Sequence, residues 1–255
     1  MVFEKYGFCL LSVGGKLLAI GGLSKGDPLS SVEVFTVEEG WRLEAKLEMR
    51  STKFYHCSVQ TGSWLYTIGG QVDGKIGASN IVEAFDTNLM STDLPIAWVK
   101  KSNMIEKRFA HGCNIGVVGG QEGILVAGGT NENYHNLASA EFYNPARDRW
   151  EAMESLKSGP RAFFPMTIVG EKLITVSGGE PGLLTRVDAW NGTSWVETAN
   201  LMVGRGFHFQ FPIFHFPFPI FHFPGGKRIP CGCEHQDWQT LVQWEKITIC
   251  ELLIL

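Results

Sequence analysis

The sequence predicts an all-β protein built from four repeated, four-stranded antiparallel sheets, and three recurring features support this prediction. A short apolar run that ends in two glycines occurs four times. After each glycine pair, an acidic residue stands two places before an aromatic residue, and a tryptophan follows further on. The composition agrees, because 30 glycines and 8 tryptophans in 255 residues indicate many turns with aromatic packing between them.

The glycine pairs set the period of the repeat. They are Gly21 and Gly22, Gly69 and Gly70, Gly128 and Gly129, and Gly178 and Gly179, at separations of 48, 59 and 50 residues. Self-similarity at a period of about 50 residues indicates a repeat architecture. We expect the glycines to be structural, because a chain that leaves the crowded centre of such a fold needs a positive φ or no side chain at all.

The other features keep the same phase. The acidic and aromatic residues are Glu33 and Phe35, Glu83 and Phe85, Glu141 and Tyr143, and Asp188 and Trp190. The tryptophans that follow are Trp41, Trp98, Trp150 and Trp195. We expect each tryptophan to fill the wedge between two adjacent sheets.

The fourth repeat shows the strands of one unit most clearly. It contains the segments AFFPMTIV, LITVSGG, RVDAW and SWVET, separated by the turn GEK, a loop and the turn NGT. The first two are almost continuously apolar, which predicts burial on both faces, whereas the third alternates. Such a meander cannot bury both faces alone, so we expect the units to stack radially as the blades of a β-propeller.

One position on the first strand of each repeat carries a cysteine or methionine. The residues are Cys9, Cys57, Cys113 and Met166. We expect the cysteines to be small, buried, apolar side chains. Because equivalent positions around a ring should not meet, we expect no disulfide among them, and a cytoplasmic setting leads to the same expectation.

The predicted domain organisation is four complete repeats followed by a degenerate fifth. The repeats cover about residues 6–50, 51–107, 108–160 and 161–205, and the remainder is 206–255. Within the remainder, the tract FPIFHFPFPIFHFP duplicates a heptapeptide, and its prolines remove hydrogen-bond donors where a central strand should run. We therefore expect a fifth blade with decayed content and an incomplete ring.

The glycine pair, the acidic-x-aromatic element and the tryptophan at this spacing resemble the kelch repeat, and the resemblance covers residues 6–205. It implies a propeller that serves as a non-catalytic, protein-binding platform. Many kelch propellers follow a BTB domain and present substrates to a cullin-RING ubiquitin ligase, and others bind actin. Neither a BTB nor a BACK domain is expected in this chain.

The resemblance also implies where a partner would bind. Residues that lead into the first strand of a kelch blade lie at one mouth of the central channel, where arginines often bind acidic peptide motifs. Arg108, Arg161 and Arg205 stand five residues before Cys113, Met166 and Gln210. Arg50 lies at a different offset before Cys57, and Glu4 occupies the matched place in the first repeat.

We therefore expect Arg50, Arg108, Arg161 and Arg205 to bind carboxylates of a partner protein, with Phe109 and Phe163 as aromatic anchors. The alternative remains that the arginines solvate loop ends or pair with local acids. Burial between blades is the corresponding alternative for the two phenylalanines.

Other functional classes have less support in the sequence. A net charge of −4 without a basic cluster indicates no nucleic-acid partner. No apolar stretch of about 20 residues and no secretory signal is seen, so we expect no membrane partner and a cytoplasmic location.

We expect no catalytic residue, metal or other cofactor. GLSKG matches a serine-nucleophile pattern but lacks the strand-to-helix elbow, and the spacing in CGCEHQD is atypical of zinc sites. A galactose-oxidase-like enzyme and a truncated product without independent function stay open as alternatives. Self-association through exposed blade edges is a further expectation.

Overall fold

The computed structural model describes residues 1–72, 77–92, 96–170, 172–176, 184–198 and 200–204. The internal contacts of the chain divide it into two units, residues 1–214 and 215–255. The predicted fifth repeat, the glycines at 178 and 179, and Arg205 lie outside the described residues.

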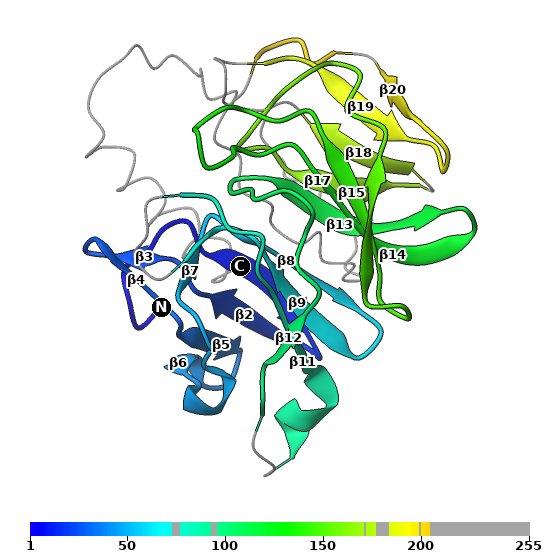
Figure 1. Cartoon of the computed structure of the whole chain (residues 1–255). Helices are drawn as coiled ribbons and strands as arrows, with labels where there is room; N and C mark the ends of the chain where they lie inside the picture. The colour runs from blue at the N-terminus through cyan, green and yellow to red at the C-terminus, as the bar shows by residue number, and fades with distance from the viewer. Residues whose placement is uncertain (73–76, 93–95, 171, 177–183, 199, 205–255) are drawn as a thin grey trace, which may run out of the picture. The chain divides into compact units, whose positions relative to one another are not determined.

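Four antiparallel sheets of four strands each follow one another along the chain, which confirms the predicted propeller-type arrangement (Figure 1). Blade 1 contains β1 (Cys9–Val13), β2 (Lys16–Ile20), β5 (Val32–Thr36) and β6 (Gly40–Leu43). Blade 2 contains β8 (Cys57–Thr61), β9 (Trp64–Ile68), β11 (Val82–Asp86) and β12 (Val99–Lys101). Blade 3 contains β13 (Gly112–Val118), β14 (Gln121–Ala127), β15 (Ala140–Asn144) and β16 (Arg149–Met153). Blade 4 contains β17 (Met166–Val169), β18 (Lys172–Val176), β19 (Val187–Trp190) and β20 (Trp195–Glu197).

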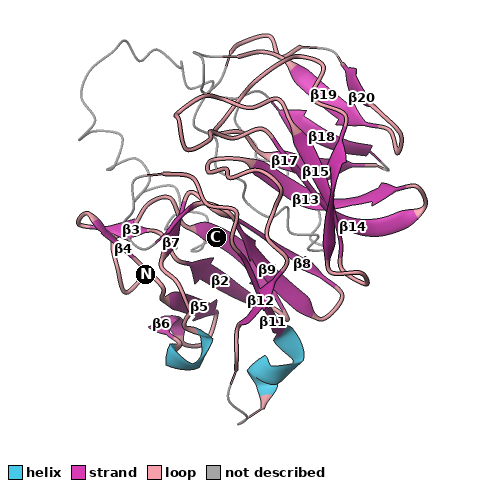
Figure 2. Ribbon diagram, in the orientation of Figure 1, coloured by secondary structure: helices cyan, strands magenta, loops and turns pink. Residues whose placement is uncertain are grey.

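Strand is the dominant regular structure of the described residues, with two short 3₁₀ helices, Ala45–Leu47 and Thr87–Ser91 (Figure 2). Two minor ladders pair β3 (Leu23–Ser24) with β4 (Asp27–Pro28) and β7 (Lys53–Phe54) with β10 (Gln71–Val72). Ser24 of the GLSKG motif therefore lies in a small hairpin. No helix among the described residues is long and apolar enough to cross a membrane.

Apolar side chains fill the space between neighbouring blades. Val32 and Val34 of blade 1, for example, pack in one buried cluster with Phe85 and Trp98 of blade 2. The ring nitrogen of Trp98 also donates to the carbonyl of Leu47 in blade 1, at 2.8 Å. Trp150 packs in a cluster with residues of blade 2, and its ring nitrogen donates to the carbonyl of Ser102 at 2.8 Å. These tryptophans thus occupy the wedge between two blades and bond to the earlier one.

The register of the first strands corrects the predicted equivalence of the cysteines. Cys9 pairs with Ile20 and Cys57 with Ile68, each the residue before a glycine pair. In blade 3 the corresponding partner, Ala127, faces Gly112, so Cys113 stands one residue further along. Successive side chains of a strand point to opposite faces. Cys113 therefore points back toward blade 2, while Cys57 points forward toward blade 3.

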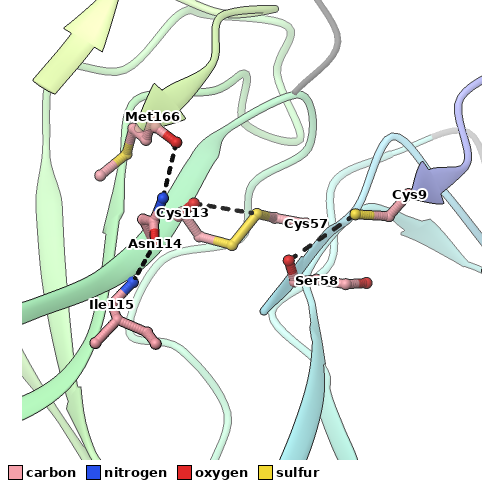
Figure 3. Close-up of a disulfide and its surroundings, with 7 residues drawn as sticks. All are labelled: Cys9, Cys57, Ser58, Cys113, Asn114, Ile115 and Met166. Carbon is pink, nitrogen blue, oxygen red and sulfur yellow. Dashed lines mark hydrogen bonds between the residues drawn. A yellow bond between two sulfur atoms is a disulfide. The ribbon is translucent and has the colours of Figure 1, made fainter. Parts of the chain in front are cut away.

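This displacement allows a disulfide between Cys57 and Cys113, with Cα atoms 6.1 Å apart (Figure 3). The prediction that the cysteines remain unpaired was wrong for these two residues. Cys9 is a free thiol, and its sulfur lies 3.9 Å from the carbonyl oxygen of Ser58. Burial of this thiol raises the pKa of Cys9.

The three described glycine pairs have the backbone conformation that their residue type favours. Gly69 and Gly70 have φ values of 60° and 87°. A Cβ atom on Gly69 would come within 2.6 Å of the carbonyl oxygen of Arg108 in the next blade, so the site has no room for a side chain. The amide of Gly70 donates to that same carbonyl at 3.0 Å. The pair thus allows two blades to approach and joins them.

Candidate interaction surface

Each blade contains a buried ion pair between a basic residue that precedes its first strand and the acidic residue of its third strand. The pairs are Lys5–Glu33 at 3.0 Å, Lys53–Glu83 at 3.4 Å, Arg108–Glu141 at 2.7 Å and Arg161–Asp188 at 2.9 Å. All eight side chains are buried. The acidic residue of the repeat therefore neutralises a cation within its own blade.

Arg108 and Arg161 are thereby placed in the interior, where neither residue has any exposed surface. Arg108 also donates to the carbonyls of Gly128 and Ser139, at 2.7 and 3.1 Å. This corrects the expectation that these two guanidiniums contact a partner, because both are buried and ion-paired inside the blade. Of the open alternatives, pairing with local acids is the one observed.

Register explains the error in matching these cations. The equivalents of Arg108 and Arg161 in the first two blades are Lys5 and Lys53, because all four form the same ion pair. Because Cys113 is shifted by one residue, counting back five residues gave Glu4 in the first repeat. In the second repeat the count gave no cation, so Arg50, seven residues before Cys57, was considered instead. A basic residue four places before Cys9, Cys57 and Gly112 was the signal available in the sequence.

Burial lowers the pKa of Lys5, and the adjacent Glu33 carboxylate opposes that shift. Burial likewise lowers the pKa of Arg161, opposed by Asp188. Arg50, by contrast, is exposed in the segment before β7.

A row of main-chain hydrogen bonds joins the four described blades two residues after each of these cations. The amide of Tyr55 donates to Gly7, that of Ala110 to Tyr55, and that of Phe163 to Ala110, at 2.7, 2.8 and 2.8 Å. All four residues have positive φ, at 64° for Gly7, 50° for Tyr55, 53° for Ala110 and 54° for Phe163. Blades 1 and 3 carry small residues in this conformation, whereas blades 2 and 4 carry large aromatic ones.

Aromatic side chains gather around these main-chain hydrogen bonds. We call this group the aromatic surface, and it consists of Tyr6, Phe54, Tyr55, Phe109, Tyr134 and Phe163. The rings of Tyr55 and Phe163 are 5.3 Å apart in an edge-to-face arrangement. Phe109 lies 6.4 Å from Tyr55 and 6.1 Å from Tyr134. Tyr6 and Tyr134 are 47% and 55% exposed, while Phe109 is buried beneath its neighbours. Phe163 is partly buried and packs on Phe109 and Ala110.

Two pockets flank the aromatic surface. One, of about 560 Å³, is lined by Ala78, Lys107 and Glu132 among others. The second, of about 480 Å³, includes Tyr134, His135 and Arg186. Lys107 and Glu132 form an exposed ion pair at 2.6 Å. The described residues contain no group of three or more potential metal ligands.

A family model described as the kelch motif matches residues 5–40, which run from the buried cation of blade 1 through its third strand. The first repeat matches the kelch motif. This confirms the resemblance predicted from the sequence, and the four sheets together form the propeller arrangement described above.

Curated relatives and a solved structure are also similar to this chain. Kelch-like protein 36 from Rattus norvegicus, Bos taurus and Mus musculus is 29% identical to the chain over 152 residues, which cover 58% of this chain and 22% of each relative. The matched region thus spans less than a quarter of these relatives. The solved structure described as "Structure of YjhT" has a TM-score of 0.59 and 15% identity, over 78% of this chain and 66% of that one. At this identity it shows the fold alone.

Proposed function

We propose that this kelch propeller is a non-catalytic protein-interaction module whose binding site is the aromatic surface. The observation that carries the proposal is the conformation of Tyr55 and Phe163. A left-handed backbone costs a residue with a side chain roughly 1 to 2 kcal/mol, and such strain concentrates at functional sites. The equivalent Gly7 and Ala110 show that the fold itself requires no aromatic side chain there.

The chemistry of the surface suits a protein partner. Tyrosine and phenylalanine supply large contact areas at low entropic cost and are enriched at the centre of interfaces. The buried cation of each blade is paired with an acidic residue of the same blade. Recognition by the aromatic surface therefore depends on apolar contact more than on charge. This replaces the acidic peptide motif expected from the arginines as the main determinant of recognition.

The finer part of the proposal is a role in substrate recognition for a cullin-RING ubiquitin ligase adaptor in the cytoplasm. It is supported by the similarity to Kelch-like protein 36 and by the kelch resemblance. It requires a BTB domain, either in another chain or in a longer product.

The binding site is tested by replacing Tyr55 and Phe163 with glycine, the residue that blade 1 carries at this position. We expect Y55G and F163G to melt within a few degrees of the wild type, because relief of the strained φ offsets the lost ring contacts. Affinity capture with quantitative mass spectrometry should then show a set of wild-type partners that both variants lose.

V117T is the matched control. Val117 is an apolar side chain, 48% exposed, near the end of β13 that lies farther from the aromatic surface. It should retain the captured partners. Equal recovery by the wild type and both glycine variants would contradict the proposal.

A further inference from the structure

We propose that the Cys57–Cys113 disulfide is a redox-controlled staple for one seam of the propeller, the seam between blades 2 and 3. When the bond is formed, this seam is held closed. When the bond is reduced, this seam opens more readily than the seams on either side. The proposal does not depend on the identity of any binding partner.

The geometry repeats at the three seams between the described blades, and of these three seams only the second has two cysteines. The residue at the start of the first strand faces the next blade, and it meets the residue one step further along that blade's first strand. At the first seam these residues are Cys9 and Ser58, with the sulfur and the Ser58 carbonyl 3.9 Å apart. At the second they are Cys57 and Cys113. At the third, a Cβ on Gly112 would meet the side chain of Met166 at 2.6 Å.

The disulfide lies next to the hydrogen bonds that join its two blades. The amide of Ala110, three residues before Cys113, crosses the seam to Tyr55, two residues before Cys57. The amide of Gly70 crosses it to the carbonyl of Arg108. Because the bond links strands 56 residues apart in sequence, it removes many open conformations that the reduced chain would reach.

Reduction follows ordinary thiol–disulfide exchange with a dithiol reductant. One thiolate of the reductant attacks a sulfur of the pair and forms a mixed disulfide, and its second thiol displaces the remaining cysteine. Two electrons and two protons pass to the protein, which gains two thiols, while the reductant becomes a disulfide. Cys57 and Cys113 are only 7% and 1% exposed, so attack requires opening of the seam. In the proposed cytoplasmic location, such bonds are usually reversible rather than permanent.

Three equivalent amides report separately on the three seams. Tyr55 reports on the first, Ala110 on the second and Phe163 on the third, since each donates across its seam. We would measure their hydrogen exchange in the full chain at residue resolution, oxidised and after treatment with dithiothreitol. Reduction should accelerate exchange at Ala110 and Gly70 by roughly tenfold or more and leave Tyr55 and Phe163 nearly unchanged.

Two variants sharpen this test. In C57S/C113S, dithiothreitol should no longer alter exchange at Ala110. In S58C, the new cysteine should form a disulfide with Cys9, and oxidation should then slow exchange at Tyr55 and Gly22, the reporters of the first seam.

Several outcomes would overturn the proposal. One is alkylation of both Cys57 and Cys113 in the denatured, unreduced chain, which would show that the bond is absent. Another is equal acceleration at all three reporter amides on reduction, which would show that the bond acts on the whole fold. Failure of S58C to cross-link with Cys9 would refute the repeated geometry on which the inference rests.

Discussion

At the scale of single residues, His56 and His111 occupy the position just before the first strand that Phe164 occupies in blade 4. A Cβ on Gly21 would meet Cε1 of His56 at 3.0 Å, and a Cβ on Gly128 would meet Cε1 of Phe164 at 2.7 Å, so the two rings occupy equivalent places. Neither nitrogen of His56 has a hydrogen-bond partner among the described residues. Burial, together with the charges of Lys53 and Lys5, lowers the pKa of His56 from 6.5 to about 3.

This shift predicts acid sensitivity. The folded-state pKa of His56 lies below the unfolded value, so the unfolded chain takes up the proton first as the pH falls below 6.5. The free energy of unfolding should therefore decrease by about 2 kcal/mol between pH 7 and pH 5 on account of His56 alone. We expect H56F, which copies Phe164, to lose less stability over this interval when thermal unfolding is followed by circular dichroism.

The control for this prediction is H135Q, because His135 is exposed. It should show the wild-type dependence on pH. An H56F variant with an unchanged dependence would show that His56 is not the responsible group.

At the scale of the blade, one ion pair links the entry segment to the third strand. Glu141 binds Arg108 and also accepts hydrogen bonds from the amides of Ile105 and Glu106, at 2.7 and 3.0 Å. The carboxylate therefore holds the segment that leads into β13. The repeat conserves this arrangement through different residue types, lysine with glutamate and arginine with aspartate.

Removing Glu141 should leave the buried Arg108 with a single, partly exposed carboxylate, Glu106, at 3.4 Å. We expect E141Q to lower the free energy of unfolding by about 3 kcal/mol in urea denaturation. E132Q, which breaks the exposed Lys107–Glu132 pair, should cost less than about 1 kcal/mol. Comparable effects of the two substitutions would contradict a structural role for the buried pair.

At the scale of the whole molecule, blade 1 differs from the other blades in its aromatic pair. Phe85 and Trp98 of blade 2 are 4.7 Å apart and are buried against blade 1, and Tyr143 and Trp150 pack likewise on blade 2. The equivalent Phe35 and Trp41 are 5.3 Å apart and remain partly exposed. β1 is the first strand of the described residues, so no described blade stands before this pair.

We expect this face to promote self-association of the purified chain. Sedimentation velocity should show a mass that rises with concentration, and F35T/W41T should reduce that rise because less apolar surface is exposed. V37T is the control, since Val37 is 88% exposed in the neighbouring turn. A wild-type chain that sediments as a monomer at every concentration would refute the prediction.

The sequence by itself determined the type and order of the elements. The glycine pairs, the alternation of the third strands and the tryptophans predicted four-stranded blades in sequence order, because these signals depend on local backbone conformation and strand period. They also located Trp98 and Trp150 in the wedges between blades. Such features need no knowledge of which side chains meet across a seam.

The tertiary structure alone decided the contacts between blades. A shift of one residue turns a side chain to the opposite face of its strand. Cys113 stands one residue beyond Gly112, the equivalent of Cys57, and it can therefore form a disulfide with Cys57. The same shift concealed Lys5 and Lys53 as the equivalents of Arg108 and Arg161. The left-handed conformation of Tyr55 and Phe163 was equally hidden, because it is imposed by hydrogen bonds from neighbouring blades rather than by residue type.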